Sequence, residues 1–222
     1  MVVRFVSAPR AQGLSYEEFQ AHWRGEHGTV AGQIPGIRGY VQNHAVIAGG
    51  LPVLPYVGFD ALSEISFDSI AAMDEGFASD HFREAVTADE QVLVDKTHFY
   101  MLLAERRVLD DRPVSNGAVK LITCLPLEAG ASIGDLGEAL AGPYREALSD
   151  VPIRRHEQLF EIPGAHAGRA PAFCAAADLL WFDDCNAALA FVTSEAADRA
   201  RRELTGLAFG AERIIARPVT IV

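Results

Sequence analysis

The chain has 222 residues, of which 50% are hydrophobic and 22% are charged, a balance typical of a globular protein rather than of a disordered or fibrous one. The formal net charge of −11 argues against binding to nucleic acid or anionic membranes, because phosphate binding needs a basic face. There is no apolar signal-peptide core and no run of the roughly 18 apolar residues that a membrane span needs. The three cysteines show no metal or redox spacing, so we expect a cytoplasmic protein with reduced thiols.

The first half of the chain alternates strands and helices. Ser15 and Glu18 have the form of a capping box, which begins a helix, and Pro35 requires that helix to have ended. Ser69 is expected to cap a second helix. The expected strands lie at about 2–7, 37–48, 56–67 and 97–109. The order β-α-β-β-α-β predicts a ferredoxin-like unit, with two helices on one face of a four-stranded antiparallel sheet.

The second half repeats this order. Ser66-Phe67-Asp68 is echoed by Trp181-Phe182-Asp183, one of several matches at a spacing of about 115 residues. The expected elements are strands at 119–127, 153–162, 173–182 and 212–222, and helices at 132–148, interrupted by Pro143, and 186–204. We therefore predict an α+β protein in which two ferredoxin-like βαββαβ repeats, residues 1–109 and 118–222 with a linker at 110–117, pair into an α+β barrel within one chain. A second sheet would cover an apolar sheet face that is otherwise bare.

Three of the seven histidines lie within residues 22–44, and this clustering indicates a site. Trp23 and His27 are four residues apart on the predicted helix, so the indole can shield the imidazole from water. An imidazole with an unperturbed pKa of about 6.5 can take up and return a proton near neutral pH. The structural alternative is a histidine that hydrogen-bonds a carbonyl where the helix ends.

Tyr40, Gln42 and His44 lie on one face of the predicted strand, because side chains alternate along a strand. Three polar side chains on one face favour the lining of a cavity, since burying them unpaired is costly. Tyr40 could donate a hydrogen bond to a developing oxyanion. Equally, Tyr40 and His44 could be structural residues at a sheet edge.

We expect no metal site in this region. In an α-helix His22 and His27 are turned about 140° apart, which does not match a zinc motif. His22 and Glu26 are four residues apart, and they either orient the imidazole or form a solvated surface pair. His81, His156 and His166 are expected at the surface.

The first half of the chain resembles the EthD domain of the dimeric α+β barrel superfamily over about residues 1–107. The residues that carry the resemblance are Gly13-Leu14-Ser15, Glu18-Phe19, His22-Trp23, His27, Pro35-Gly36, Tyr40, Gln42-Asn43-His44, Phe59-Asp60, Glu64 and Phe67-Asp68. The second half resembles the same fold without most of this motif, since His27 aligns there with Tyr144. The second repeat is therefore expected to be a structural partner.

The resemblance implies a small-molecule cavity and activity without metal or organic cofactor, as in methylmuconolactone isomerases and aromatic polyketide cyclases or dehydratases. It places the catalytic histidine and tyrosine at His27 and Tyr40. Asp60 and Glu64 share a face of the third strand and match the family pattern. They join the expected substrate-binding residues, which are Trp23, Gln42, His44, Asp60, Glu64 and His98.

We expect a cofactor-independent enzyme that isomerises, cyclises or dehydrates a small aromatic, polyketide-like or lactone compound by proton transfer. One alternative is an oxidoreductase, either a cofactor-free oxygenase or a haem-binding barrel. The other is a non-catalytic small-molecule binder. The sequence leaves open the substrate and whether two chains pair as a homodimer.

Overall fold

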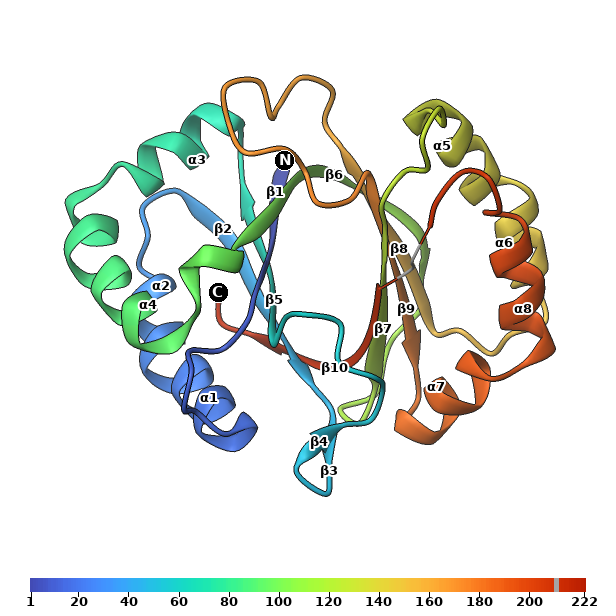
Figure 1. Ribbon diagram of the computed structural model, residues 1–222, viewed down its shortest axis with the longest axis horizontal. Helices are drawn as coiled ribbons and strands as arrows, with labels where there is room; N and C mark the ends of the chain where they lie inside the picture. The colour runs from blue at the N-terminus through green and yellow to red at the C-terminus, as the bar shows by residue number, and fades with distance from the viewer. Residues whose placement is uncertain (210–211) are drawn as a thin grey trace. The chain divides into compact units, whose positions relative to one another are not determined.

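Eight strands of the computed structural model, which describes residues 1–209 and 212–222, form a closed barrel in the order β1-β5-β2-β10-β7-β9-β8-β6 (Figure 1). The elements of the first half are β1 (Val2–Ala8), α1 (Tyr16–His22), η1 (Trp23–His27), α2 (Gly28–Ala31), β2 (Ile37–Ala45), β3 (Ile47–Ala48), β4 (Leu51–Pro52), β5 (Ala61–Phe67), α3 (Ile70–Phe77), η2 (Phe82–Val86), α4 (Thr87–Leu93), η3 (Lys96–His98) and β6 (Tyr100–Asp111). Those of the second half are β7 (Val119–Leu125), α5 (Ile133–Ala141), α6 (Pro143–Ala147), β8 (Arg155–Glu161), β9 (Ala176–Phe182), α7 (Cys185–Val192), α8 (Glu195–Arg202) and β10 (Glu212–Thr220). The predicted α+β fold is confirmed.

The chain divides into two compact units. Unit 1 consists of Met1–Arg106, Glu161–Phe173 and Ala216–Val222, and unit 2 consists of Arg107–Phe160 and Cys174–Ile215. Strand β6 continues to Asp111, two residues into the segment expected as a linker. The predicted domain limits stay a prediction. No helix within the described residues is long and apolar enough to cross a membrane.

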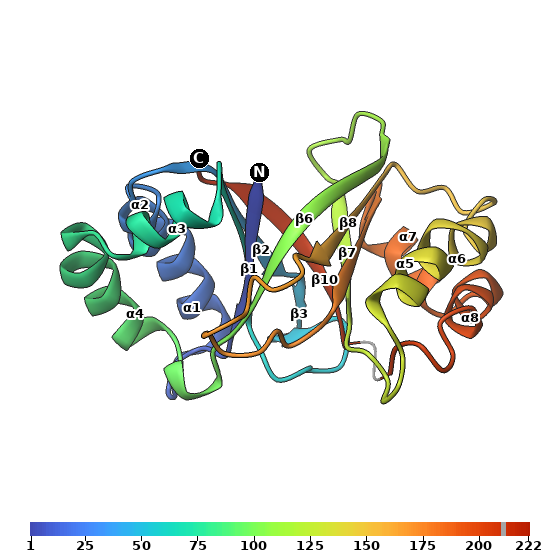
Figure 2. The same ribbon diagram turned by 90° about the horizontal axis from the view of Figure 1, so that it is seen from above.

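In unit 1, helices cover one face of an antiparallel sheet. Strand β5 pairs with both β1 and β2, and β1 also pairs with β6. Figure 2 shows α1, α2, α3 and α4 on the same side of these strands. In unit 2, β9 pairs with β7 and β8 in the same antiparallel manner.

Local sequence signals begin the helices as predicted. The Ser15 hydroxyl accepts a hydrogen bond from the backbone N–H of Glu18, and the Glu18 carboxylate accepts one from the backbone N–H of Ser15. Ser69 caps α3. Pro143 stands at the first position of α6, after the helix of the second repeat has ended at Ala141, so the predicted interruption is confirmed.

Two features of unit 1 differ from the expectation. The helix from Tyr16 to Ala31 contains a π-helical turn, η1, whose hydrogen bonds span five residues instead of four. After α3 the chain forms two further helical segments, η2 and α4, where no helix was expected. Ser79 explains this restart, because its hydroxyl donates to the Gly76 carbonyl and accepts from the Phe82 N–H. These two features position the site.

Candidate functional site

A pocket lies between the helices and the covered sheet face of unit 1. Its strand wall is formed by alternate residues of β1 and β5, and its helix wall by residues of η1, η2 and α4. The polar side chains that line it are Arg4, His27, Tyr40, Ser63 and Glu90. Its volume of about 40 Å³ holds a few water molecules, whereas benzene fills a cavity of about 150 Å³. An aromatic ligand therefore has to displace side chains at the wall.

Asp89 joins two imidazoles. Its Oδ2 lies 2.7 Å from Nδ1 of His27, and its Oδ1 lies 2.6 Å from Nε2 of His22. The π-helical turn explains why both histidines reach one carboxylate, since residues five apart then come onto nearly the same face. The α-helical geometry assumed from the sequence, which separated them by about 140°, is wrong here.

This arrangement fixes the orientation of the His27 ring. Its Nδ1 hydrogen-bonds the carboxylate, while its Nε2 has no hydrogen-bond partner within the part of the chain that the structure describes. Burial raises the pKa of the Asp89 carboxyl, but the hydrogen bonds from His27 and His22 outweigh this effect and hold the pKa below its usual value. Asp89 is therefore ionised at neutral pH, and His27 is 8% exposed at the pocket.

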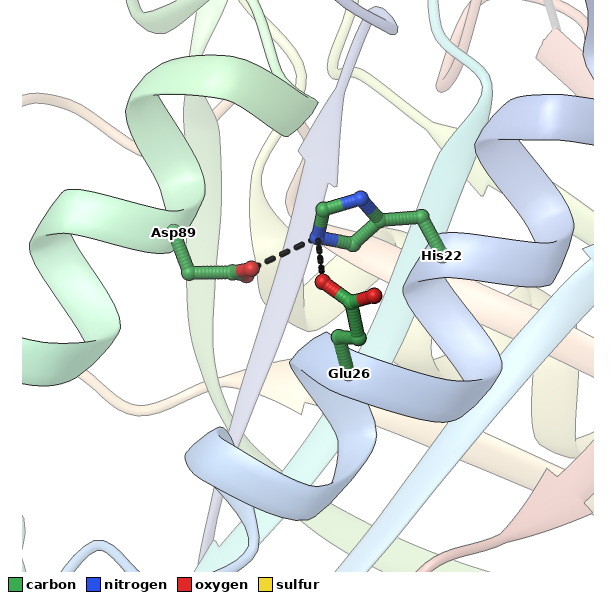
Figure 3. Close-up of side chains that lie close together, drawn as sticks. All are labelled: His22, Glu26 and Asp89. Atoms are coloured by element: carbon green, nitrogen blue, oxygen red, sulfur yellow. Dashed lines mark hydrogen bonds and ion pairs between the residues drawn. The ribbon is translucent and has the colours of Figure 1, made fainter.

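Among the residues that the structure describes, His22, Glu26 and Asp89 form the one cluster of side chains that could hold a metal ion (Figure 3). Their ligand atoms lie within 4.8 Å of one another, and His22 Nε2 is 3.7 Å from a Glu26 carboxylate oxygen. Glu26 is exposed, and Asp89 already hydrogen-bonds two imidazoles. Asp89 is thus satisfied by its hydrogen bonds to the two imidazoles, and Glu26 adds a longer ion pair with His22.

Tyr40, Gln42 and His44 form a buried chain of hydrogen bonds. The Gln42 amide nitrogen donates to the Trp23 carbonyl at 2.7 Å and to the Tyr40 hydroxyl at 3.0 Å, and the Gln42 amide oxygen lies 2.9 Å from Nε2 of His44. An amide oxygen only accepts, so the His44 proton is on Nε2. Because the Tyr40 oxygen accepts from Gln42, the Tyr40 hydroxyl proton can point to a ligand.

Burial determines the protonation states of His44 and Tyr40 in this hydrogen-bonded chain. It lowers the pKa of His44 to about 4, with a further contribution from the positive charge of Arg24, so the ring is neutral at pH 7. The Trp23 indole covers this ring at 4.5 Å between centroids. Burial also raises the pKa of Tyr40 well above its usual value, despite hydrogen bonds from Gln42 and Trp23. Tyr40 is therefore a neutral donor.

The predicted site residues are only partly brought together. Trp23, His27 and Tyr40 line the pocket. Gln42 hydrogen-bonds the Tyr40 hydroxyl and is itself hydrogen-bonded by His44. The other three residues, Asp60, Glu64 and His98, are not among its lining residues.

Asp60, Glu64 and His98 each have another structural place. Asp60 is buried and pairs with Arg10 at 2.6 Å. Glu64 accepts hydrogen bonds from Asn43 and Arg106, on the opposite face of β5 from the pocket residue Ser63. His98 is on the exposed turn η3 rather than on a strand, because Asp95 caps that turn and β6 begins at Tyr100.

Sequence reasoning missed Arg4, Asp89 and Glu90 as candidate site residues. The spacing of Phe82, Val86 and Leu93 is helical and would have indicated the helix that carries both acids. Arg4 is the one charged residue of strand β1 and is at a position that faces the helices, which is itself a signal.

The histidines that were expected at the surface are buried or partly buried. His156 was expected at the surface, but it is 5% exposed and its Nε2 lies 2.7 Å from an Asp178 carboxylate oxygen. Tyr144 and Gln158 also donate hydrogen bonds to the Asp178 carboxylate. His156 also borders a pocket of about 140 Å³ in unit 2. His166 is partly buried and accepts a hydrogen bond from a backbone N–H.

The fold and the site define the class of the protein as an α+β barrel with ferredoxin-like topology. Residues 11–97 match the family model of the EthD domain. No curated protein matches the sequence.

Several solved structures share the fold at low sequence identity. A candidate monooxygenase from Lactobacillus acidophilus NCFM is 12% identical, with a TM-score of 0.57 over 100% of this chain and 94% of that chain. A candidate monooxygenase from Fusobacterium nucleatum subsp. nucleatum ATCC 25586 is 6% identical, with a TM-score of 0.62 over 97% and 90%. An anthrone oxidase-like protein is 14% identical, with a TM-score of 0.66 over 99% and 92%.

Proposed function

We propose that the chain is an enzyme that transfers a proton to or from a small aromatic, polyketide-like or lactone compound bound in the pocket of unit 1, without a cofactor. The EthD domain and the pocket support a protein that binds or converts a small molecule. The observation that carries the enzymatic proposal is the Asp89–His27 pair, in which a carboxylate orients an imidazole at the wall of a pocket.

His27 would be the general base and acid. Its Nδ1 donates to the ionised Asp89 carboxylate, which stabilises the imidazolium that forms when Nε2 takes a proton from the ligand. The same nitrogen would return the proton to another atom of the ligand. A positioned general base of this kind contributes about 10²- to 10⁴-fold to a rate.

Tyr40 would stabilise the negative charge that develops on the ligand oxygen. Its hydroxyl is neutral and is held by Gln42, so it is oriented before the ligand arrives. A hydrogen-bond donor that is already in place avoids reorganisation during the reaction. Isomerisation, cyclisation and dehydration all include such an enolate or phenolate.

A second candidate function is oxidation by O₂, supported by the names of three structural neighbours, two candidate monooxygenases and an anthrone oxidase-like protein. It would begin with the same step, because removal of a proton gives the electron-rich carbanion or phenolate that O₂ attacks. A CH₂ group and O₂ would then give a carbonyl group and water. His27 and Tyr40 would have the same roles.

The test separates proton transfer from oxidation. Wild-type protein is incubated with a panel of lactones, anthrones and polyketide-like phenols in D₂O, with and without O₂. We expect deuterium to enter the acidic C–H position under both conditions. O₂ consumption with carbonyl formation would favour the oxidase, and an isomerised or dehydrated product without O₂ would favour the first function.

Variants then assign the roles. His27→Gln is expected to reduce deuterium exchange and turnover by at least 100-fold with a nearly unchanged Tm. Asp89→Asn is expected to reduce both rates by a smaller factor and to give a pH dependence of the rate that differs from that of the wild type. His98→Gln is a matched control, since His98 is exposed and does not line the pocket. Binding of panel compounds without exchange or turnover would leave only the non-catalytic binder.

A further inference from the structure

Arg4 places a positive charge in the wall of the same pocket. It lies on β1 with Val6 and Ala8, the alternate residues that face the helices. Its guanidinium carbon is 4.2 Å from the centroid of the Phe77 ring and 5.4 Å from that of Phe99. Two aromatic rings thus hold the guanidinium at the pocket, but they do not neutralise its charge.

The Arg4 guanidinium has no hydrogen-bond or ion-pair partner among the described side chains of residues 1–209 and 213–222. Glu90, the acid that influences it most, is paired with Lys96. Two positive side chains thus share one carboxylate, which leaves one positive charge uncompensated. Burial lowers the pKa of Arg4 to about 10, so it is still protonated at neutral pH.

Other partly buried arginines of unit 1 are paired. Arg10 lies 2.6 Å from an Asp60 oxygen, and Arg106 lies 2.6 Å from a Glu64 oxygen. A buried charge without a partner is costly, so an unpaired guanidinium at a pocket is best explained by a ligand that supplies the missing anion. Arg4 is also outside residues 11–97, so the match to the EthD domain does not include it.

We propose that Arg4 binds an anionic oxygen of the ligand, and that the substrate is therefore a small, largely apolar molecule with one carboxylate or one ionised phenol or enol. Arg4 and Tyr40 line the same pocket, so an oxyanion can receive hydrogen bonds from both. The guanidinium presents a planar fork of donors that suits a carboxylate. This inference rests on the proposed function, whose substrate class it narrows.

The test measures binding, which does not require turnover. Benzoate and its neutral analogue benzamide are titrated into the full chain at pH 7.5, and 4-nitrophenol is added as a phenol whose absorbance reports its ionisation. We expect wild-type protein to bind benzoate at least tenfold more tightly than benzamide, or to bind 4-nitrophenol as its phenolate with a lowered pKa. The first result identifies a carboxylate as the source of the anion, and the second an ionised phenol.

Three variants show whether Arg4 is responsible. Arg4→Met should abolish the preference for the anion, and Arg4→Lys should retain part of it. Arg38→Met is the matched control, because Arg38 is an exposed residue of β2 that pairs with the exposed Asp68 and does not line the pocket. A structural role between two aromatic rings would instead lower the Tm of Arg4→Met and leave the preference intact.

The inference is overturned if wild-type protein binds neither anion in preference to its neutral form, a result that needs no variant to fold. It is also overturned if Arg4→Met keeps the preference. His27→Gln separates the two proposals, since it should stop turnover and still bind benzoate. Turnover that depends on His27 without any anion preference would refute only the role of Arg4, and anion binding without any turnover would refute only the enzymatic function.

Discussion

The buried His44 should make the stability of the protein depend on pH between about 4 and 6.5. Burial lowers the pKa of this imidazole from 6.5 to about 4. In the unfolded chain His44 takes up a proton as the pH falls through 6.5, whereas in the folded chain it stays neutral until about pH 4. The unfolded state thus binds more protons in this window, so the contribution is fully present above pH 6.5 and is lost as the pH falls.

The size of the effect follows from the shift. Each pKa unit corresponds to about 1.4 kcal/mol, so the complete loss is about 3 kcal/mol. At pH 5 the loss is about 2 kcal/mol relative to pH 8. This is a large part of the 5–15 kcal/mol that is typical of a folded domain.

Urea unfolding at pH 8 and pH 5 measures this loss, with His44→Gln as the comparison. Glutamine has no titratable group and keeps a donor for the Gln42 amide oxygen, and the carboxylates that also titrate are the same in both proteins. We expect the wild type to lose about 2 kcal/mol more than the variant between the two pH values. Equal losses in the two proteins would show that His44 is protonated in the folded state, and the argument from burial would fail.

Gly76→Ala and Asp60→Asn test the packing and the ion pairing of unit 1, and Gly137→Ala in unit 2 is a control for the first. Gly76→Ala should lower the free energy of unfolding by about 2 kcal/mol, although alanine favours a helix by about 1 kcal/mol, because a Cβ there would lie 2.5 Å from the Pro35 carbonyl oxygen. Gly137→Ala, whose Cβ would meet its nearest neighbour at an ordinary 3.7 Å, should raise this free energy in the same urea assay. Asp60→Asn should cost about 2 kcal/mol, since it weakens a partly exposed pair with Arg10. A fall in turnover with unchanged stability would instead place Asp60 in the site.

The sequence predicts the order of elements well, because the signals for it are local. The capping box at Ser15, the cap at Ser69 and the interruption at Pro143 each depend on neighbours within four residues. The repeat of the same order 115 residues later then requires two ferredoxin-like units. These signals do not depend on how distant parts of the chain pack.

The side of strand β5 that faces the pocket could not be predicted in this way. Six of its seven residues are buried, so the alternation of polar and apolar residues that normally distinguishes two strand faces is missing. The acids Asp60 and Glu64 are at even-numbered positions. The residues that line the pocket, Ala61, Ser63 and Ile65, are at odd-numbered positions and therefore on the other face of the strand. The register of strand β5 alone decides which of its faces lines the pocket, and this register is set by pairing with strands that are distant in the sequence.

Asp89 was missed for a related reason. Its role depends on the π-helical turn, which brings two histidines to one carboxylate, and on a helix whose position is set by packing against the first helix. The positions of Tyr40 and His27 did follow from the family pattern, and both line the pocket. Their catalytic roles stay a prediction.

The cluster of Tyr144, His156, Gln158 and Asp178 shows what a tandem arrangement permits. Tyr144, the counterpart of His27 in the second repeat, donates to the Asp178 carboxylate at 2.8 Å. In a symmetric homodimer any substitution appears in both subunits at once. Two copies encoded in one chain acquire mutations separately. One copy can therefore evolve a functional site while the other evolves a more stable core, and a substitution in one copy does not change the other.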